Sequence, residues 1–195
     1  MENDVLERDG METELKQDKK KKWRGYLFEA LIYISLCIIC AVVIPNYVAQ
    51  RAKVSGPSME NTLFDGDNVL VDKISYRFHN PKRFDVVVFY PYEGDDEHFV
   101  KRVIGLPGET IQIIGPDIYI NGELLEEKYG KDPIHYQGIA ANPLTLGDDE
   151  FFLMGDNREV SFDSRYEDIG AVHKRAIDGK AILRMWPIKD FGTFK

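Results

Sequence analysis

The chain has 195 residues, of which 44% are hydrophobic and 30% are charged. This composition supports one packed domain of about 100 to 200 residues with an appendage, and it excludes a wholly disordered chain. The 25 Lys and Arg residues are outnumbered by 33 Asp and Glu, giving a formal net charge of -8 that argues against a nucleic acid partner.

The N-terminal part of the chain predicts a membrane anchor. Residues 1–18 mix acidic and basic side chains without a hydrophobic period, so we expect a disordered tail there. Basic residues then gather at Lys16, Lys19, Lys20, Lys21, Lys22 and Arg24. The apolar run 27–48 is long enough to cross a bilayer, because about 20 helical residues span the hydrocarbon core. The basic cluster predicts a single-pass protein of the cell membrane, with 1–26 cytoplasmic, 27–48 transmembrane and 49–195 extracytoplasmic.

Two other interpretations of the apolar run were weighed. A cleaved secretory peptide needs small residues before the cleavage point, but Tyr47 lies two residues before Ala49, which favours an uncleaved anchor. Cys37 and Cys40 have CxxC spacing, yet a thiolate is costly in lipid, so packing residues are expected instead of a redox pair. Because both cysteines lie in this run, neither a disulfide framework nor a Cys-rich zinc site is expected.

The remainder of the chain is expected to be mainly β. Short apolar, β-branched or aromatic runs separated by turn residues predict strands over 68–71, 85–90, 99–104, 110–114, 118–120, 151–154 and 181–186. Asn121 and Gly122 predict a hairpin turn with positive φ at both residues. No long amphipathic helix competes, so we expect strongly bent antiparallel sheets or a partial barrel, preceded by one N-terminal transmembrane helix.

Metal and hydrolase signatures are not found in the sequence. None of the four histidines has HxH or HExxH spacing, and the acidic loops 94–97 and 148–150 lack EF-hand spacing, so no metal and no cofactor are expected. The segment 56–60, GPSME, matches half of a GxSxG elbow. It lacks the final glycine and a following long helix, which argues against an α/β-hydrolase.

Three polar features remain, each weak when taken singly. Ser58 lies in a tight loop shortly after the predicted anchor. Lys101 lies in an apolar strand on the same face as Phe99 and Val103, so its cation must reach water or be accommodated among apolar side chains. The third feature is a polar stretch made of Gly155-Asp156-Asn157-Arg158, Ser161, Asp163, Ser164 and Arg165. A hydrophilic loop with one surface ion pair is its simplest explanation.

Taken together and in this order, the three features resemble the motifs of the bacterial type I signal peptidases. These are membrane-anchored Ser/Lys endopeptidases that release signal peptides from secreted preproteins. The resemblance extends from the apolar run to about Gly170. It rests on SGPSM at 55–59, KRVIGLPG at 101–108 and the polar stretch 155–165. The mainly β fold of that family agrees with the strands predicted above.

The resemblance implies roles for individual residues. Ser58 would be the nucleophile, Lys101 the general base, and Ser161 the hydroxyl that orients the lysine. A structural ion-pair group would comprise Asp163, Arg165 and Arg102. The family prefers small residues at the first and third positions before the scissile bond, which implies shallow apolar pockets in the peptidase. The candidate pocket walls are Val54, Met59, Leu63, Phe99 and Val100. Expected partners are secretory preproteins with such small residues and the lipid bilayer.

These residue types suit the implied chemistry. A serine hydroxyl becomes a good nucleophile only when a base takes its proton, and a lysine can do so only when neutral. Burial lowers the pKa of a lysine by up to several units, towards the operating pH. Two positions depart from the family pattern. Gly56 replaces a serine that some members use to stabilise the oxyanion, which leaves backbone donors, Ser58 N–H above all, and Asn61 replaces a frequent proline.

Two other functions were considered. A different Ser/Lys peptidase, such as the self-cleaving repressor type, shares the β scaffold, but the anchor and the GDNR sequence argue against it. A non-catalytic membrane-tethered assembly factor or pilin chaperone on the same scaffold is the second alternative. Retention of both Ser58 and Lys101 argues against it, because a decayed enzyme has no reason to keep the pair.

Overall fold

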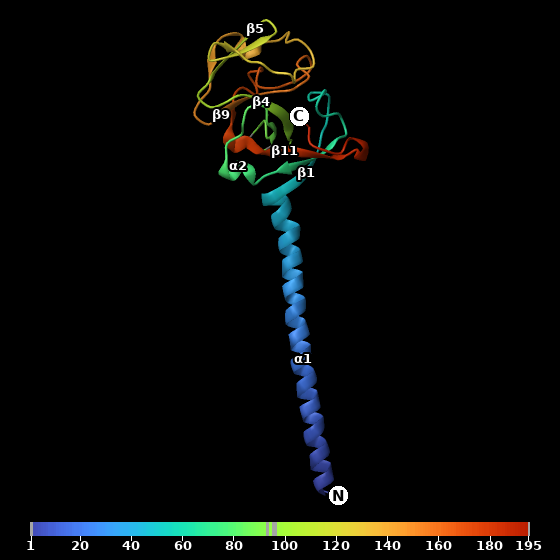
Figure 1. Cartoon of the computed structure of the whole chain (residues 1–195). Coiled ribbons are helices and arrows are strands. Elements are labelled where there is room, and N and C mark those ends of the chain that lie inside the picture. Colours follow the sequence, from blue (N-terminus) through green and yellow to red (C-terminus); the bar gives the residue numbers. More distant parts are fainter. Residues whose placement is uncertain (1, 93, 95–96, 195) are drawn as a thin grey trace. The chain divides into compact units, whose positions relative to one another are not determined.

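The computed structural model describes residues 2–92, 94 and 97–194, with the backbone alone described for 2–21. The chain divides into two compact units, Met1–Pro45 and Asn46–Lys195. The first unit is helical and the second is built from β-sheets (Figure 1). Each unit is described in turn.

The first unit is one long helix. Helix α1 spans Glu2–Val43 and is followed by a π-helical turn, η1, at Ile44–Val48. The segment Lys22–Val48 is long and apolar enough to cross a membrane: an 18-residue window within it has a mean hydropathy of 2.7, and protein buries none of that window. The disordered tail expected over 1–18 is instead helical from Glu2. Its residue types explain the difference, since Glu, Lys, Leu and Met favour helix and the segment contains no proline.

A seven-stranded antiparallel sheet forms the base of the second unit, in the order β1-β2-β11-β3-β4-β9-β10. The strands are β1 (Ala49–Lys53), β2 (Asn68–Asp72), β3 (Val86–Phe89), β4 (Phe99–Gly105), β9 (Glu150–Met154), β10 (Val172–His173) and β11 (Ile177–Trp186). Register shifts interrupt the pairing of β11 with both neighbours and of β4 with β9. Such irregularities bend a strand and increase its twist, which is how this sheet curls into a half-barrel.

Glycines allow close packing at two of these register shifts. A Cβ atom on Gly179 would lie 2.5 Å from the carbonyl oxygen of Asp72. A Cβ atom on Gly105 would lie 2.9 Å from Cβ of Phe152. Neither neighbour is the flexible end of a side chain, so both positions require glycine if the sheet is to keep its curl.

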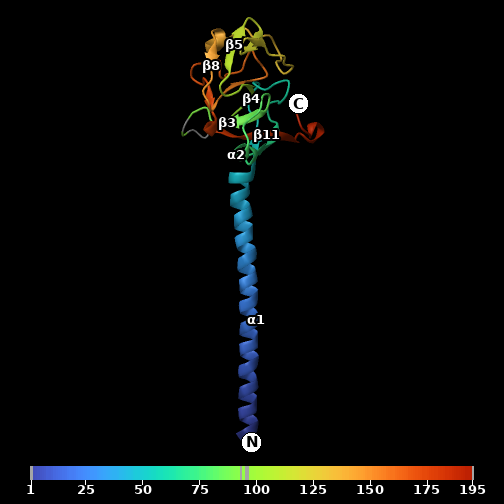
Figure 2. The same cartoon turned by 60° about the vertical axis from the view of Figure 1, so that its left-hand side comes forward.

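A second, four-stranded sheet lies at the far end of this unit from β1, in the order β7-β6-β5-β8 (Figures 1 and 2). Its strands are β5 (Thr110–Ile114), β6 (Asp117–Ile120), β7 (Glu123–Leu124) and β8 (Leu144–Thr145). Asn121 and Gly122 make the turn between β6 and β7 with φ of 53° and 82°. The predicted hairpin is therefore confirmed, including its positive φ angles.

The mainly β class is confirmed, and all seven predicted strands are present. Helical structure in the second unit consists of short turns among the described residues: α2 (Ser75–Phe78), η2 (Gly138–Ala141), η3 (Lys174–Ala176) and η4 (Ile188–Asp190). Strand β1 was not predicted, because its sequence AQRAK has no β-branched or aromatic residue. Its pairing with β2, from Ala49 opposite Asp72 to Lys53 opposite Asn68, is what makes it a strand.

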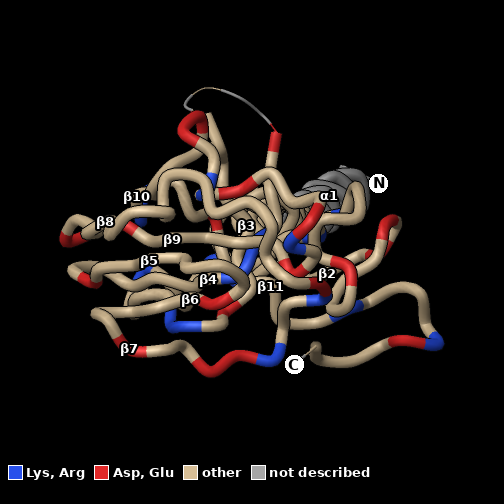
Figure 3. The backbone as a smooth tube through the Cα atoms, turned by 90° about the horizontal axis from the view of Figure 1, so that it is seen from above, with Lys and Arg blue, Asp and Glu red and all other residues tan. Residues whose placement is uncertain are grey.

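Strand β4 contributes to all three apolar clusters of the second unit. Ile104 belongs to the cluster shared with the second sheet, and Val103 to the cluster around Phe151. Val100 packs against the third cluster, which includes Val54 and Met59. Because apolar side chains cover both faces of β4, its polar side chains are held away from bulk water. Figure 3 shows acidic and basic positions interspersed along the outer turns and strands of this unit.

Candidate active site

Ser58 lies in the loop between β1 and β2, which is built from tight turns. The amides of Glu60 and Thr62 donate hydrogen bonds to the carbonyls of Pro57 and Met59, both over 3.0 Å. Gly56 has a φ of 82° and Asn61 a φ of 93°. A proline could not adopt the Asn61 conformation, because its ring fixes φ near -65°. The loop after Ser58 therefore has a geometry that the proline frequent in this position elsewhere would not allow.

Lys101, on β4, contacts the Ser58 side chain directly. Its Nζ atom donates a hydrogen bond to Ser58 Oγ over 2.8 Å. The residue is 4% exposed, and Nζ lies 5.3 Å from the centroid of the Phe99 ring, two positions earlier on the same strand face. The two residues expected to form a dyad are separated by 43 positions in the sequence and are brought into hydrogen-bond contact by the fold.

Burial lowers the pKa of Lys101 from its ordinary value of 10.5 to about 8, because the apolar surroundings disfavour the ammonium form. The negative charge of Asp163 opposes this decrease in the pKa, Arg165 assists it, and Asp156 opposes it. A substantial neutral fraction of the lysine is therefore present near pH 8. A neutral amine in contact with a hydroxyl is the arrangement required for proton abstraction.

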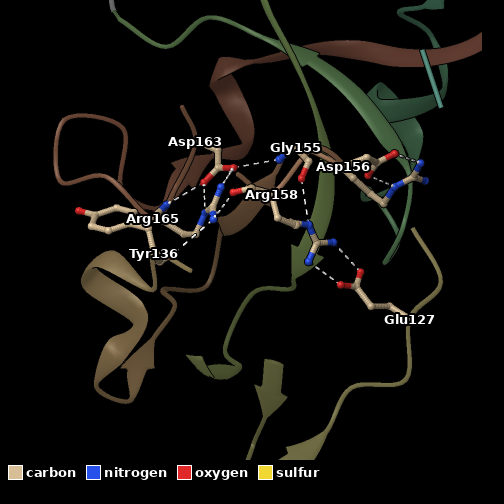
Figure 4. A network of polar contacts seen from close by, with 8 residues as sticks. Glu127, Tyr136, Gly155, Asp156, Arg158, Asp163 and Arg165 are labelled. Carbon is tan, nitrogen blue, oxygen red and sulfur yellow. Dashed lines mark hydrogen bonds and ion pairs between the residues drawn. The ribbon is translucent and has the colours of Figure 1, made fainter. Parts of the chain in front are cut away.

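Asp163 and Arg165 form a buried, bidentate ion pair. Arg165 Nε and Nη2 donate to the two carboxylate oxygens of Asp163 over 2.8 and 2.9 Å. The Gly155 amide also donates to Asp163, over 3.0 Å, and Arg165 Nη1 donates to the Arg158 carbonyl over 2.8 Å (Figure 4). The polar stretch is thus folded around this pair rather than being a solvated loop.

The resemblance implied that Arg102 belongs to the same ion-pair group as Asp163 and Arg165, but the structure does not place it there. It pairs instead with Asp156, through Nε to Oδ1 over 2.8 Å and Nη2 to Oδ2 over 2.6 Å. Arg102 follows Lys101 directly on β4, so its side chain leaves the strand on the opposite face. Thr62 joins this second pair: its hydroxyl donates to Asp156 Oδ2 over 2.5 Å and accepts from Arg102 Nη2 over 3.0 Å.

Ser161 is buried next to the proposed dyad without bonding to the lysine. Among the described residues its Oγ atom has no hydrogen-bond partner. A Cβ atom on Gly155 would lie 2.2 Å from Ser161 Oγ and 2.4 Å from the Ser58 carbonyl oxygen. Gly155 therefore must be glycine for Ser161 and Ser58 to approach as they do. The expected orienting role of Ser161 stays a prediction.

The predicted pocket walls divide into two groups. Val54, Met59 and Leu63 are buried members of one apolar cluster. They pack beneath the Ser58 loop, and their assignment as pocket walls stays a prediction. Phe99 and Val100 are partly exposed beside Lys101 on β4 and stay candidate walls.

Several neighbours of the site carry no recognisable local signal. The Asn157 amide donates to the Ser58 carbonyl over 3.0 Å, and Thr62 contacts the Arg102–Asp156 pair. The ring of Tyr129, from the connection after β7, lies over the Arg102 guanidinium. Only the position of Asn157 within the GDNR sequence pointed to this set. Among the residues that the structure describes, no group of three or more His, Cys, Asp or Glu is arranged to hold a metal.

Known proteins share this sequence over most of its length. The family model described as "Signal peptidase, peptidase S26" matches residues 27–186. The signal peptidase I of Leptolyngbya laminosa is 40% identical over 173 residues, covering 85% of this chain and 83% of that protein. The signal peptidase I of Bacillus amyloliquefaciens is 35% identical over 169 residues, covering 83% of this chain and 89% of the relative.

A solved structure is also similar. The crystal structure of a signal peptidase I from Enterococcus faecalis has 32% sequence identity and a TM-score of 0.41, covering 52% of this chain and 97% of that one. The family match includes the Ser58 loop, strand β4 and the polar stretch 155–165. Because that match and these relatives cover well over half of the sequence, the chain belongs to the signal peptidase family, peptidase S26.

Proposed function

We propose that this chain is a serine endopeptidase that cleaves signal peptides from secreted preproteins at the outer face of the cytoplasmic membrane. Ser58 is the nucleophile and Lys101 the general base. The observation that carries the proposal is the 2.8 Å hydrogen bond between Lys101 Nζ and Ser58 Oγ, made by a lysine that is 4% exposed. No carboxylate of the described residues forms an ion pair with this lysine, so its neutral form is accessible.

The reaction proceeds in two halves. Neutral Lys101 takes the Ser58 proton as Oγ attacks the scissile carbonyl, and the resulting ammonium then protonates the leaving amine. This leaves an acyl group on Ser58 and a neutral lysine. Lys101 next takes a proton from water, which attacks the ester carbonyl; the bond from the acyl carbon to Ser58 Oγ then breaks as the ammonium returns its proton to Oγ, which releases the signal peptide and restores the neutral lysine. The Ser58 N–H has no acceptor among the described residues, so it is available to stabilise the oxyanion in both halves.

The buried ion pairs support this chemistry by keeping negative charge away from the lysine. An unpaired Asp163 would stabilise the ammonium form of Lys101 and raise its pKa. Arg165 neutralises that carboxylate at hydrogen-bond distance. We assign Ser161, whose hydroxyl is buried beside Ser58, to orienting the lysine during the reaction.

The substrate and location follow from the helix and the family. The segment Lys22–Val48 is apolar and is not covered by protein, which suits a lipid environment. The basic cluster before it assigns the N-terminus to the cytoplasm. Ser58 follows Val48 by ten residues, a reach of at most about 35 Å, so it must lie near the outer interface. Preproteins with small residues before the cleavage site are the proposed substrates.

No observation favours the non-catalytic assembly factor. A scaffold that had lost its reaction would gain nothing from a buried amine, because the ammonium form is penalised by desolvation. The buried lysine in contact with Ser58 serves the proposed reaction and does not add to the stability of the fold. The peptidase assignment is therefore retained over the alternative.

The first test replaces each member of the proposed dyad. In full-length enzyme in detergent, Ser58→Ala and Lys101→Met should each lower preprotein cleavage by at least about 1000-fold, because nucleophile and base act as one unit. Ser55→Ala and Lys53→Met are matched controls, because both residues are exposed in the same region. These two variants should cleave the preprotein at the wild-type rate. Wild-type cleavage by Ser58→Ala or Lys101→Met would refute the assignment.

The pH dependence of cleavage provides a second test. Because burial lowers the pKa of Lys101 to about 8 and only the neutral amine is active, kcat/KM should rise with pH and level off above that value. Below the midpoint the expected slope is about tenfold per pH unit. A profile measured on a short signal-peptide substrate that is flat, or that falls between pH 6 and 8, would contradict a lysine base.

A further inference from the structure

One segment of the connection that follows the second sheet's strand β7 lies close to the proposed dyad. Residues 127–131, in the connection that follows β7, are here called the brace. At its start, the two carboxylate oxygens of Glu127 accept hydrogen bonds from Arg158 Nη1 and Nη2 over 2.5 and 2.7 Å (Figure 4). Arg158 is buried, and its Nε also donates to the Gly155 carbonyl over 2.9 Å. The brace is thereby attached to the polar stretch.

Tyr129 lies at the centre of the brace and covers Arg102. The Arg102 Cζ atom is 3.8 Å from the centroid of the Tyr129 ring, a close cation–π contact. The other sides of the guanidinium contact Asp156, Thr62 and the carbonyl of Phe84, the last over 2.8 Å. Arg102 is consequently only 2% exposed. The tyrosine ring covers a face of the guanidinium, where no N–H group points and no hydrogen bond can form.

Lys131, at the end of the brace, contacts the polar stretch a second time and also the loop that carries Ser58. Its amide donates to the Asp156 carbonyl over 2.8 Å. Its Nζ atom pairs with Glu60, two residues after Ser58, over 2.9 Å. The brace therefore contacts the polar stretch, the strand that carries Lys101 and the loop that carries Ser58, although all five of its residues come from outside the recognised motifs.

From this arrangement we infer that Tyr129 is a positioning residue. By covering the Arg102–Asp156–Thr62 cluster, it fixes the position of the Ser58 loop relative to strand β4. The inference rests on the proposed function and extends it. Arg102 is covalently next to Lys101, and Thr62 belongs to the turn that begins at Ser58, so a shift in their contacts moves the two reactive atoms relative to each other. Rates of positioned reactions are sensitive to displacements of this kind. Tyr129 itself contacts neither Ser58 nor Lys101 among its described interactions.

The test compares two substitutions at one position. Tyr129→Leu removes the π face, whereas Tyr129→Phe keeps it and loses only the hydroxyl. In full-length enzyme in detergent, Tyr129→Leu should lower kcat by about tenfold, with KM for a preprotein changed less than about twofold, because positioning affects the reaction step. Tyr129→Phe should restore kcat to within about twofold of wild type. Tyr119→Leu is the matched control, since Tyr119 is also half-buried and lies on β6 of the second sheet.

The outcomes separate this inference from the proposed function. Active enzyme is counted by titration with a serine-acylating probe, so partial unfolding does not enter kcat. If Tyr129→Leu does not fold, Tyr129→Met replaces it, since methionine fills space without a ring. A kcat for the leucine or methionine variant equal to that of Tyr119→Leu would overturn the positioning role. A wild-type enzyme that cleaves no preprotein would instead overturn the proposed function, whatever the variants do.

Discussion

The segment 22–48 and the interior around Ser58 both depart from the usual pattern of apolar residues inside and charged residues outside, and they do so in opposite ways. The helical segment contains an 18-residue apolar window of which protein buries none. The interior of the β unit buries charged side chains that are usually found at a surface. These are Asp67, Lys101, Arg102, Asp156, Arg158, Asp163 and Arg165.

Each inversion requires a different compensation. Exposed apolar surface is stable when lipid replaces water, whereas buried charge is stable when a partner neutralises it at hydrogen-bond distance. Six of the seven buried ions have such a partner among the described residues, and Lys101 is the exception. The residue left without an opposite charge is the one to which the reaction assigns a neutral state. The following predictions test the two kinds of compensation, from the largest expected effect to the smallest.

The largest effect is expected in the helix. Ile34→Arg combined with Ile38→Arg places two cations in the apolar span, at a cost of about 5 to 7 kcal/mol for insertion into a bilayer. The variant should be lost from the membrane pellet after an alkaline wash, whereas Ile34→Leu with Ile38→Leu should be retained. Both isoleucines are exposed, so a helix surrounded by water would tolerate the arginines. Equal retention of both variants would mean that lipid does not cover this surface.

The second effect concerns a buried pair. Asp163→Asn leaves Arg165 buried without its counter-ion and should lower the free energy of unfolding by about 3 to 5 kcal/mol. Asp190→Asn is the control, because its pair with Lys189 is long, at 3.9 Å, and exposed. Removing Asp163 also removes a charge that opposes the decrease in the Lys101 pKa, so the pH midpoint of residual activity should move lower. Unfolding in urea that is indistinguishable between the two variants would contradict this account.

The third effect links the base to stability. Because burial lowers the Lys101 pKa from 10.5 to about 8, the native state holds its ammonium less readily than the unfolded state does. Stability should therefore be reduced below pH 8, by at most about 3 kcal/mol, and recovered as the pH rises towards 10.5. Lys101→Met should unfold at a higher temperature than wild type at pH 7, and the difference should narrow by pH 10. A methionine variant that is less stable at pH 7 would show that burial does not penalise the ammonium.

The strands and the contact between Ser58 and Lys101 could be predicted from sequence because both have local signals. Alternating apolar runs and the pair Asn121-Gly122 are sufficient for the strands and one hairpin, and the three motifs led to Ser58 and Lys101. The strand β1 could not be predicted, since only pairing with β2 distinguishes AQRAK from a linker. The helix over 2–18 was missed because composition was weighed above helix propensity.

The contacts that hold the site together could not be predicted for a different reason. Thr62 and Asp156 are 94 positions apart, and no periodicity of either segment indicates that their side chains meet. The partner of Arg102 was misassigned because the motif placed Asp163 and Arg165 in one group with it, whereas strand alternation sends Arg102 to Asp156. Tyr129 has no motif at all. Such long-range contacts depend on the curl of the sheet, which arises from register shifts rather than from residue patterns.

The bond from the Asn157 amide to the Ser58 carbonyl has a consequence for biosynthesis. The ribosome adds Ser58 early, whereas Asn157, which binds the Ser58 carbonyl, is added nearly a hundred positions later. A nascent chain that ends before residue 157 therefore contains Ser58 and Lys101 but lacks this hydrogen bond to the Ser58 loop. The proposed proteolytic activity should therefore arise late in synthesis, after residue 157 has been made.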